Sequence, residues 1–162
     1  MYNPESLARA DLADRRRRAG RNEPSIDSVA AALEYTAIFS QCSKRELKLV
    51  AKLAKTKMLR AGTELIKEGE TGDSMFVMIS GHAKVSRDGR KLADISAGGV
   101  VGELAVFSKE PRNATVTLST DAEVATINRR DVYRLIEDAP GFARKLLEAM
   151  ANRIRDLHES VT

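Results

Sequence analysis

Apolar residues at three- and four-residue spacing near the start of the chain predict two helices. The first opens after Pro24, with Ser25 or Asp27 as its cap. The second opens at Ser43, because Glu46 stands three residues later and these two residue types form a capping box. The apolar faces of the two helices are expected to consist of Val29, Ala30, Leu33, Leu47, Val50, Ala51 and Ala54.

The same helical spacing returns towards the C-terminus. Asp131 is the expected cap of one helix. Pro140 suits the first turn of another, because its ring fixes a helical φ. The apolar positions of this second pair are Val132, Leu135, Ile136, Phe142, Leu146, Leu147, Met150, Ile154 and Leu157. A pair of helices therefore flanks each side of a central region.

In the central region, after Lys55, the apolar period falls from about 3.6 to about 2, and glycine-bearing turns separate short strand candidates. Asp88-Gly89 is the clearest hairpin turn, since the central positions of a two-residue turn need positive φ. The strand candidates are Met58, 65–66, 75–79, 83–85, 92–95, 114–118 and 123–127. Regular short strands of this kind predict a sandwich or small barrel.

A length of 162 residues suits one domain with tails. We expect a basic N-terminal arm over residues 1–24, the folded domain over 25–158 and a tail over 159–162. Half of the formal net charge of +4 lies in the first 25 residues, which include Arg15, Arg16, Arg17 and Arg18. Such an arm binds nucleic acid, acidic lipid or an acidic protein, or is simply a solvated tail.

Composition narrows the function classes. The lone Cys42 cannot form an intramolecular disulfide, and the chain has neither an export signal nor a bilayer-length apolar run, so we expect a cytoplasmic protein. His82 and His158 are too few for a His-rich metal site, and no spacing ties Cys42 to either as a nucleophile pair. We expect no metal, no cofactor and no enzymatic activity. Scarce aromatic residues disfavour stacking on single-stranded nucleic acid.

The segment 101–116, Val-Gly-Glu-Leu-Ala-Val-Phe-Ser-Lys-Glu-Pro-Arg-Asn-Ala-Thr-Val, is unusual within a run of strands. Residues 104–107 suffice for about one helical turn, whose unpaired amides form an anion site with the helix dipole. Gly102 permits close approach of a ligand because it has no Cβ. The guanidinium of Arg112 is permanently charged and can donate two hydrogen bonds to a phosphate. Glu103 is a poor phosphate neighbour but accepts well from a sugar hydroxyl, which suggests a sugar phosphate.

These residues resemble the phosphate-binding cassette of cyclic-nucleotide-binding domains, which occur in protein kinase A regulatory subunits, catabolite activator proteins and cyclic-nucleotide-gated channels. Residues 65–81, Leu-Ile-Lys-Glu-Gly-Glu-Thr-Gly-Asp-Ser-Met-Phe-Val-Met-Ile-Ser-Gly, resemble the family's glycine-bracketed hairpin. The resemblance covers about Phe39 to Leu157. It implies an α+β fold: an antiparallel β-roll or jelly roll (double-stranded β-helix) with N-terminal helices and two C-terminal helices.

The resemblance also implies residue roles. Glu103 would take the ribose 2′-hydroxyl and Arg112 the exocyclic phosphate oxygens. The backbone around Gly102, Leu104, Ala105 and Ala114 would supply the remaining phosphate contacts. Asn113 departs from the family pattern of Ala, Ser or Thr, and its amide would reach a guanine edge or point to solvent. The implied ligand is cAMP, favoured because the hydroxyl associated with cGMP is missing, with cGMP left open.

Other readings of the same residues remain. Arg112 is alternatively a structural residue paired with Glu103 or Asp94. Gly69, Gly72 and Gly81 are interpreted as turn formers without a site role. A different function class is an interaction module, in which the β-roll is a scaffold and the basic arm binds nucleic acid or an acidic partner.

As a sensor, the domain would couple nucleotide binding to movement of its C-terminal helices. In the family the last helix often folds over the base, which makes Arg153, Ile154 or Leu157 a candidate cap. Only five residues follow Leu157, so we expect neither a DNA-binding helix-turn-helix nor a channel segment. The partners are then a cyclic nucleotide, an effector protein or domain, and a second copy if the last helix pairs symmetrically.

Overall fold

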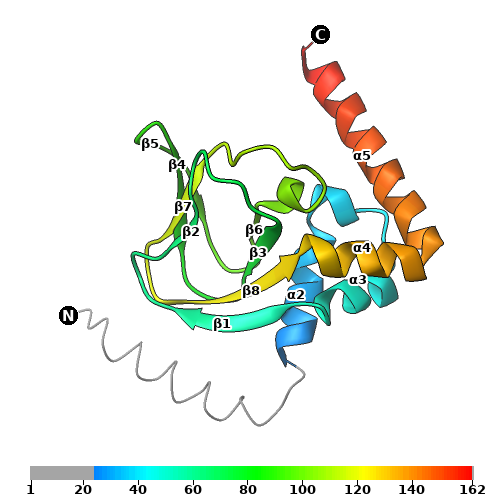
Figure 1. Cartoon of the computed structure of the whole chain (residues 1–162), viewed down its shortest axis with the longest axis horizontal. Helices are drawn as coiled ribbons and strands as arrows, with labels where there is room; N and C mark the ends of the chain where they lie inside the picture. The colour runs from blue at the N-terminus through cyan, green and yellow to red at the C-terminus, as the bar shows by residue number, and fades with distance from the viewer. Residues whose placement is uncertain (1–23, 162) are drawn as a thin grey trace.

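The computed structural model describes residues 24–161, as two sheets flanked by helices (Figure 1). The predicted arm lies outside the described residues apart from Pro24. The N-terminal helices are α2 (Pro24–Glu34), the short 3₁₀ helix η1 (Ala37–Phe39) and α3 (Lys44–Ala51). Because α2 already includes Pro24, Ser25 and Asp27 lie in its first turn, and their prediction as caps is wrong.

The capping box of α3 is confirmed. The Ser43 hydroxyl accepts from the Glu46 backbone N–H at 3.2 Å, and the Glu46 carboxylate accepts from the Ser43 N–H at 2.9 Å. These two bonds satisfy donors that the start of a helix would otherwise leave without partners. The predicted inner residues Leu47, Val50 and Ala51 are buried.

Eight antiparallel strands form the roll, in two four-stranded sheets with orders β1-β8-β3-β6 and β2-β7-β4-β5. The strands are β1 (Lys55–Leu59), β2 (Glu64–Ile66), β3 (Ser74–Met78), β4 (Ala83–Arg87), β5 (Arg90–Ile95), β6 (Val100–Val101), β7 (Thr115–Leu118) and β8 (Ala122–Asn128). The predicted fold class is confirmed. Seven strands match the candidates, whereas β6 was missed because two residues are too few to show alternation.

The predicted hairpin turn joins β4 to β5. Asp88 and Gly89 have φ of 51° and 76°, and Arg87 pairs with Arg90 across the turn. Positive φ at both central positions is what a two-residue hairpin requires. The turn sets the register of Ser86 and Arg87 against Lys91 and Arg90, and the register shifts between Val85 and Ser86.

The C-terminal helices are α4 (Arg129–Asp138) and α5 (Pro140–Val161). Pro140 begins α5 as predicted, but Asp131 does not cap α4. The Asn128 side chain accepts from the Asp131 backbone N–H at 2.9 Å, so Asn128 is the cap and Asp131 lies in the first turn. An Asn three residues ahead of an acidic residue was the signal that sequence analysis overlooked.

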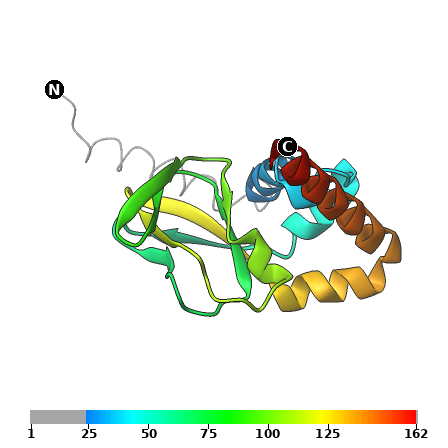
Figure 2. The ribbon, with the colours of Figure 1, turned by 90° about the horizontal axis from the view of Figure 1, so that it is seen from above.

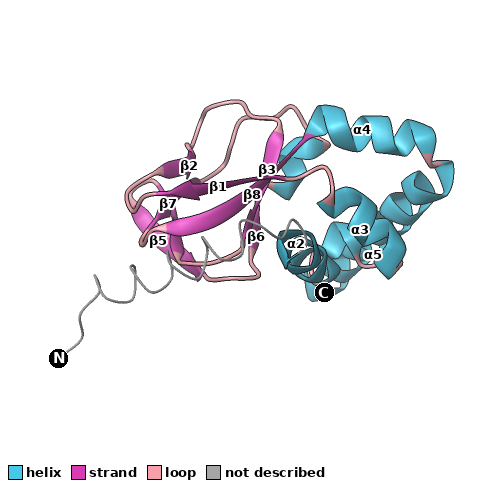
Figure 3. Cartoon of the chain, turned by 90° about the horizontal axis from the view of Figure 1, so that it is seen from below, coloured by secondary structure: helices cyan, strands magenta, loops and turns pink. Residues whose placement is uncertain are grey.

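Two apolar clusters hold the domain together. One lies inside the roll, and the other joins β3 and β8 to the helices. The helical cluster includes Phe39 of η1 and Phe142 of α5, whose rings stack with centroids 6.3 Å apart. Figures 2 and 3 show the helices gathered at one end of the roll. The domain thus has a strand end and a helical end with separate cores.

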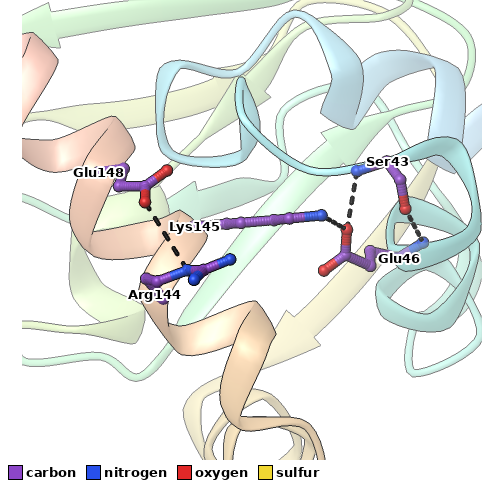
Figure 4. A network of polar contacts seen from close by, with 5 residues as sticks. All are labelled: Ser43, Glu46, Arg144, Lys145 and Glu148. Atoms are coloured by element: carbon purple, nitrogen blue, oxygen red, sulfur yellow. Dashed lines mark hydrogen bonds and ion pairs between the residues drawn. The ribbon is translucent and has the colours of Figure 1, made fainter.

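A polar contact joins α3 and α5 at the helical end. Lys145 Nζ donates to the Glu46 carboxylate that completes the capping box (Figure 4). Burial alone would raise the pKa of Glu46, but the hydrogen bonds from Lys145 and Ser43 outweigh it, and the pKa lies below its ordinary value. Nearby, burial and then Glu46 raise the pKa of the half-buried Cys42 to about 11. The thiol is therefore protonated at neutral pH, consistent with the role of a small core residue.

Candidate functional site

Two backbone hydrogen bonds join the sequence motifs 65–81 and 101–116. The Arg112 N–H donates to the Glu70 carbonyl, and the Gly69 N–H donates to the Arg112 carbonyl, both at 2.8 Å. Gly69 has φ of 85°, so it serves the turn role predicted for it. The position of Arg112, in the loop that precedes β7, is therefore fixed by the β2–β3 turn.

The Arg112 side chain reaches across to backbone carbonyls. One terminal nitrogen donates to Ser74 O at 2.7 Å and the other to Gly102 O at 3.3 Å. Within residues 24–161 no acidic side chain forms an ion pair with this guanidinium, and Asp94 pairs instead with Lys91 at 2.6 Å. The alternative in which Arg112 pairs with Glu103 or Asp94 therefore finds no contact in this structure.

Electrostatics around Arg112 favour a partner anion. Burial lowers the pKa of the guanidinium, Asp73 acts in the opposite sense, and the nearby Arg129 lowers it further. An arginine remains charged near neutral pH despite such a shift. Since its contacts here are to neutral carbonyls, the positive charge of Arg112 is left without an ion-paired carboxylate among the described residues.

Two glycines make room for the guanidinium. A Cβ on Gly102 would lie 2.6 Å from one terminal nitrogen of Arg112, and one on Gly72 would lie 2.6 Å from the other. Gly102 also has φ of 75°, a conformation that disfavours other residues. Gly72 does not have a positive φ, and what its missing side chain provides in this structure is space for the Arg112 guanidinium. A side chain at position 72 would collide with the Arg112 guanidinium.

The predicted single turn is a 3₁₀ helix, η2 (Glu103–Val106), which begins one residue earlier than expected. Ala105 N–H donates back to Gly102 O at 3.2 Å, so this amide already has an acceptor. The N–H groups of Glu103 and Leu104 precede that first intrahelical bond. These two amides, next to Gly102, are the donors that the turn can direct towards an anion.

The remaining predicted residues differ in accessibility. Leu104 is 59% exposed, whereas Ala105 and Ala114 are buried and can offer only backbone atoms. Asn113 is exposed, and its carbonyl accepts from Arg87 Nε at 2.7 Å. Glu103 is partly buried at the first position of η2. The structure thus brings Gly102 and Arg112 into contact, with Glu103 adjacent in the chain.

Sequence analysis missed Arg129, the first residue of α4. Its guanidinium donates to Val106 O at 3.2 Å, to Ser108 O at 2.9 Å and to Ala105 O. Its own backbone N–H donates to Asp73 O at 2.8 Å. A cation at the carboxyl end of η2 complements the helix dipole. Arg129 thereby ties the candidate site to α4, a role that nothing in the local sequence pattern indicates.

A pocket of about 470 Å³ includes Arg129 in its lining, together with Thr71, Gly72, Asp73 and Lys109. Gly72 is shared with the Arg112 environment, but none of the predicted ligand residues lines the pocket. No group of three or more potential metal ligands occurs in the part of the chain that the structure describes. The chemistry that the Arg112 neighbourhood supports is the binding of an anion.

Comparison with known proteins gives concordant matches. The family model "Cyclic nucleotide-binding domain" matches residues 56–139. A cGMP-dependent protein kinase of Caenorhabditis elegans is 33% identical over 116 residues, which are 72% of this chain and 15% of the kinase. This chain thus spans a small part of that relative's length.

Solved structures agree with the sequence match. The N-terminal domain of a transcriptional regulator from Streptomyces coelicolor superposes with a TM-score of 0.72 at 27% identity, covering 80% of this chain and 94% of that domain. The regulatory domain of Toxoplasma gondii PKA, crystallised with cAMP, gives a TM-score of 0.64 at 27% identity, covering 74% of this chain and 47% of that one.

Proposed function

Because the chain belongs to the cyclic nucleotide-binding domain family, we propose that it is a cAMP-binding sensor whose ligand is held by Arg112 and Glu103. The observation that carries this proposal is the Arg112 guanidinium, which lies against Gly102 at the start of η2 with only neutral carbonyls as hydrogen-bond partners. A cyclic phosphate offers such a cation two charged oxygens, and charge-assisted bonds are stronger than bonds to carbonyls.

The other predicted residues complete the site in this proposal. The backbone around Gly102, Leu104, Ala105 and Ala114 lies next to the phosphate, and Glu103 and Leu104 supply the N–H groups that precede the first intrahelical bond. The Glu103 carboxylate accepts from the ribose 2′-hydroxyl. Asp73 contributes through its electrostatic interaction with Arg112, which supports the charged guanidinium.

Nucleotide choice depends on Asn113. Its exposure agrees with a side chain that points to solvent, which leaves the base without a hydroxyl contact of the kind associated with cGMP. We therefore favour cAMP. One relative is a cGMP-dependent kinase and another protein was crystallised with cAMP, so both nucleotides belong in the test.

The proposed output passes through the C-terminal helices. Arg129 joins η2 to α4, so a change at the nucleotide site can reach α4 through the Arg129 side chain. Beyond it, Ile154 and Leu157 of α5 are 69% and 56% exposed and do not cover the roll. In the proposed sensor this apolar surface contacts the base, an effector or a second copy of the chain once ligand binds.

The proposed organisation is a binding domain over residues 25–158 with a basic arm at 1–24 and a tail at 159–162. Within residues 24–161 no helix is long and apolar enough to span a bilayer. We propose binding and regulation as the domain's activity, with neither metal nor catalysis.

Titration calorimetry with cAMP and cGMP tests the proposal. The wild type should bind cAMP with micromolar or tighter affinity, and Arg112→Ala should lose at least about 2 kcal/mol, because a charged phosphate contact is removed. Glu103→Ala should lose less, since a neutral hydroxyl is a weaker partner. Arg90→Ala, at the exposed β4–β5 turn, is the matched control and should bind like the wild type. Titrations without heat for both nucleotides, under conditions where the fold is intact, would contradict the proposal.

A further inference from the structure

The segment from Lys44 to Arg60 carries seven Lys or Arg residues and one acidic residue, Glu46. All seven cations are exposed, and the segment runs from α3 directly into β1 along the lower edge of the molecule in Figure 1. We call this the α3–β1 surface. Its cations are Lys44, Arg45, Lys48, Lys52, Lys55, Lys57 and Arg60.

Local structure directs these cations outward. On α3 the inner face is used by Leu47, Val50 and Ala51, so Lys48 and Lys52 lie on the opposite side. On β1 the cross-strand neighbours of Lys55 and Lys57 are Thr126 and Val124 of β8, neither of which is charged. The acidic residue of β8, Glu123, lies opposite Met58, so neither lysine has a charged residue directly across from it.

Acidic side chains elsewhere among the described residues neutralise little of the positive charge on the α3–β1 surface. Glu46 is engaged by Lys145 and the Ser43 N–H. Lys48 lies 3.9 Å from Asp27, but both side chains are more than half exposed, and such pairs are strongly screened. Among residues 24–161 no other ion pair involves the seven cations. The N-terminal 23 residues are themselves net basic, with six Arg against four acidic residues, and so are a poor electrostatic partner.

Residue types on the surface favour one occupant. Five of the seven cations are lysines, which act as point charges suited to a diffuse sheet of negative charge. Leu49 on α3 is 38% exposed, and a side chain of this kind can enter the boundary of a bilayer. A nucleic acid would offer this apolar group little. We propose that the α3–β1 surface docks on an anionic lipid membrane.

Vesicle sedimentation tests this proposal with the full chain. The wild type should sediment with vesicles of phosphatidylcholine containing about one third phosphatidylserine, remain in solution with phosphatidylcholine alone, and be released by high salt. The triple variant Lys52→Glu, Lys55→Glu, Lys57→Glu should partition at least about tenfold more weakly, because three contacts become repulsive. Leu49→Asn should weaken partitioning by about threefold.

The matched control changes net charge equally at other exposed cations, Lys84→Glu, Arg90→Glu and Arg155→Glu. It should keep partitioning within about twofold of the wild type. Both triple variants are also made with Arg15 to Arg18 replaced by Gln, which separates the arm from the surface, and circular dichroism verifies the fold. Equal loss in both triple variants, no sedimentation of the wild type, or loss confined to the arm variant would overturn the proposal. So would wild-type binding to duplex DNA but not to anionic vesicles.

Discussion

The Arg112 neighbourhood and the outer half of α5 differ in how much of their side-chain surface the rest of the chain contacts. At Arg112, the charge is held by backbone carbonyls and by two glycines without a Cβ, so this chain alone supplies its contacts. On α5, every residue from 151 to 159 is exposed, including Ile154 and Leu157. The first region positions its charged side chain through contacts within this chain, whereas the second leaves apolar side chains such as Ile154 exposed at the surface.

The largest expected effect is on stability, within α5 itself. Leu146→Ala should lower the free energy of unfolding by about 2–5 kcal/mol, because Leu146 is buried in the helical cluster and truncation leaves a cavity. Leu147→Ala, one residue away but 67% exposed, should change it by less than about 0.5 kcal/mol. Urea denaturation measures both values. Similar losses in the two variants would mean that the exposed face is already covered in solution.

Arg129→Met should cost about 2 kcal/mol of stability, because the carbonyls of Val106 and Ser108 lose a charged donor. It should also weaken cAMP binding, since η2 is no longer tied to α4. Arg130→Met is the control, as Arg130 is exposed and next in the chain. Urea denaturation and calorimetry on both variants provide the readout. An Arg129→Met protein indistinguishable from the control would show that Arg129 does not tie η2 to α4.

Gly72→Ala should weaken cAMP binding by about tenfold, or about 1.4 kcal/mol, with little change in folding stability. The added methyl group would meet the far end of Arg112, a flexible side chain that can move aside and so leave its binding position. Gly141→Ala is the control because its Cβ meets nothing within 4 Å. Unchanged affinity for Gly72→Ala, measured by calorimetry, would argue against a fixed position of Arg112.

The smallest expected effect concerns Glu46. Glu46→Gln should cost about 1 kcal/mol near neutral pH, from weakened bonds to Lys145 and Ser43. The folded pKa of Glu46 is below its ordinary value of 4.5, so its stabilisation is fully present above 4.5 and is lost as pH falls through the folded pKa. Denaturation at several pH values should show wild type and variant converging in acid. A constant difference down to pH about 2 would contradict this linkage.

Repeated patterns made most of the fold predictable. Two-residue alternation located seven strands, and the Ser43–Glu46 spacing gave the start of α3. Asp88-Gly89 identified its turn because φ constraints act locally. Strand β6 and the Asn128 cap were missed, the first because it is too short for a period and the second because an acidic residue inside the helix was preferred as cap.

Only part of the site could be predicted from the sequence, namely the residues that lie within one motif or that the family resemblance identifies. Gly102 and Arg112 do meet, but the roles of Gly72 and Arg129 depend on contacts between residues tens of positions apart. Gly72 resembled a turn residue in sequence, and its actual requirement is the space that Arg112 occupies. A pattern within one stretch of sequence cannot show that a side chain forty residues away needs this space.

Two hydrogen bonds, from the Arg112 N–H to Glu70 O and from the Gly69 N–H to Arg112 O, hold the loop before β7 against the β2–β3 turn. These two segments therefore move together. A ligand that draws Arg112 inward must carry this turn with it, and Asp73 in the same loop is bonded to the first residue of α4. A displacement of Arg112 can thus reach the first residue of α4 by two routes, through η2 and the Arg129 guanidinium and through the Asp73 carbonyl.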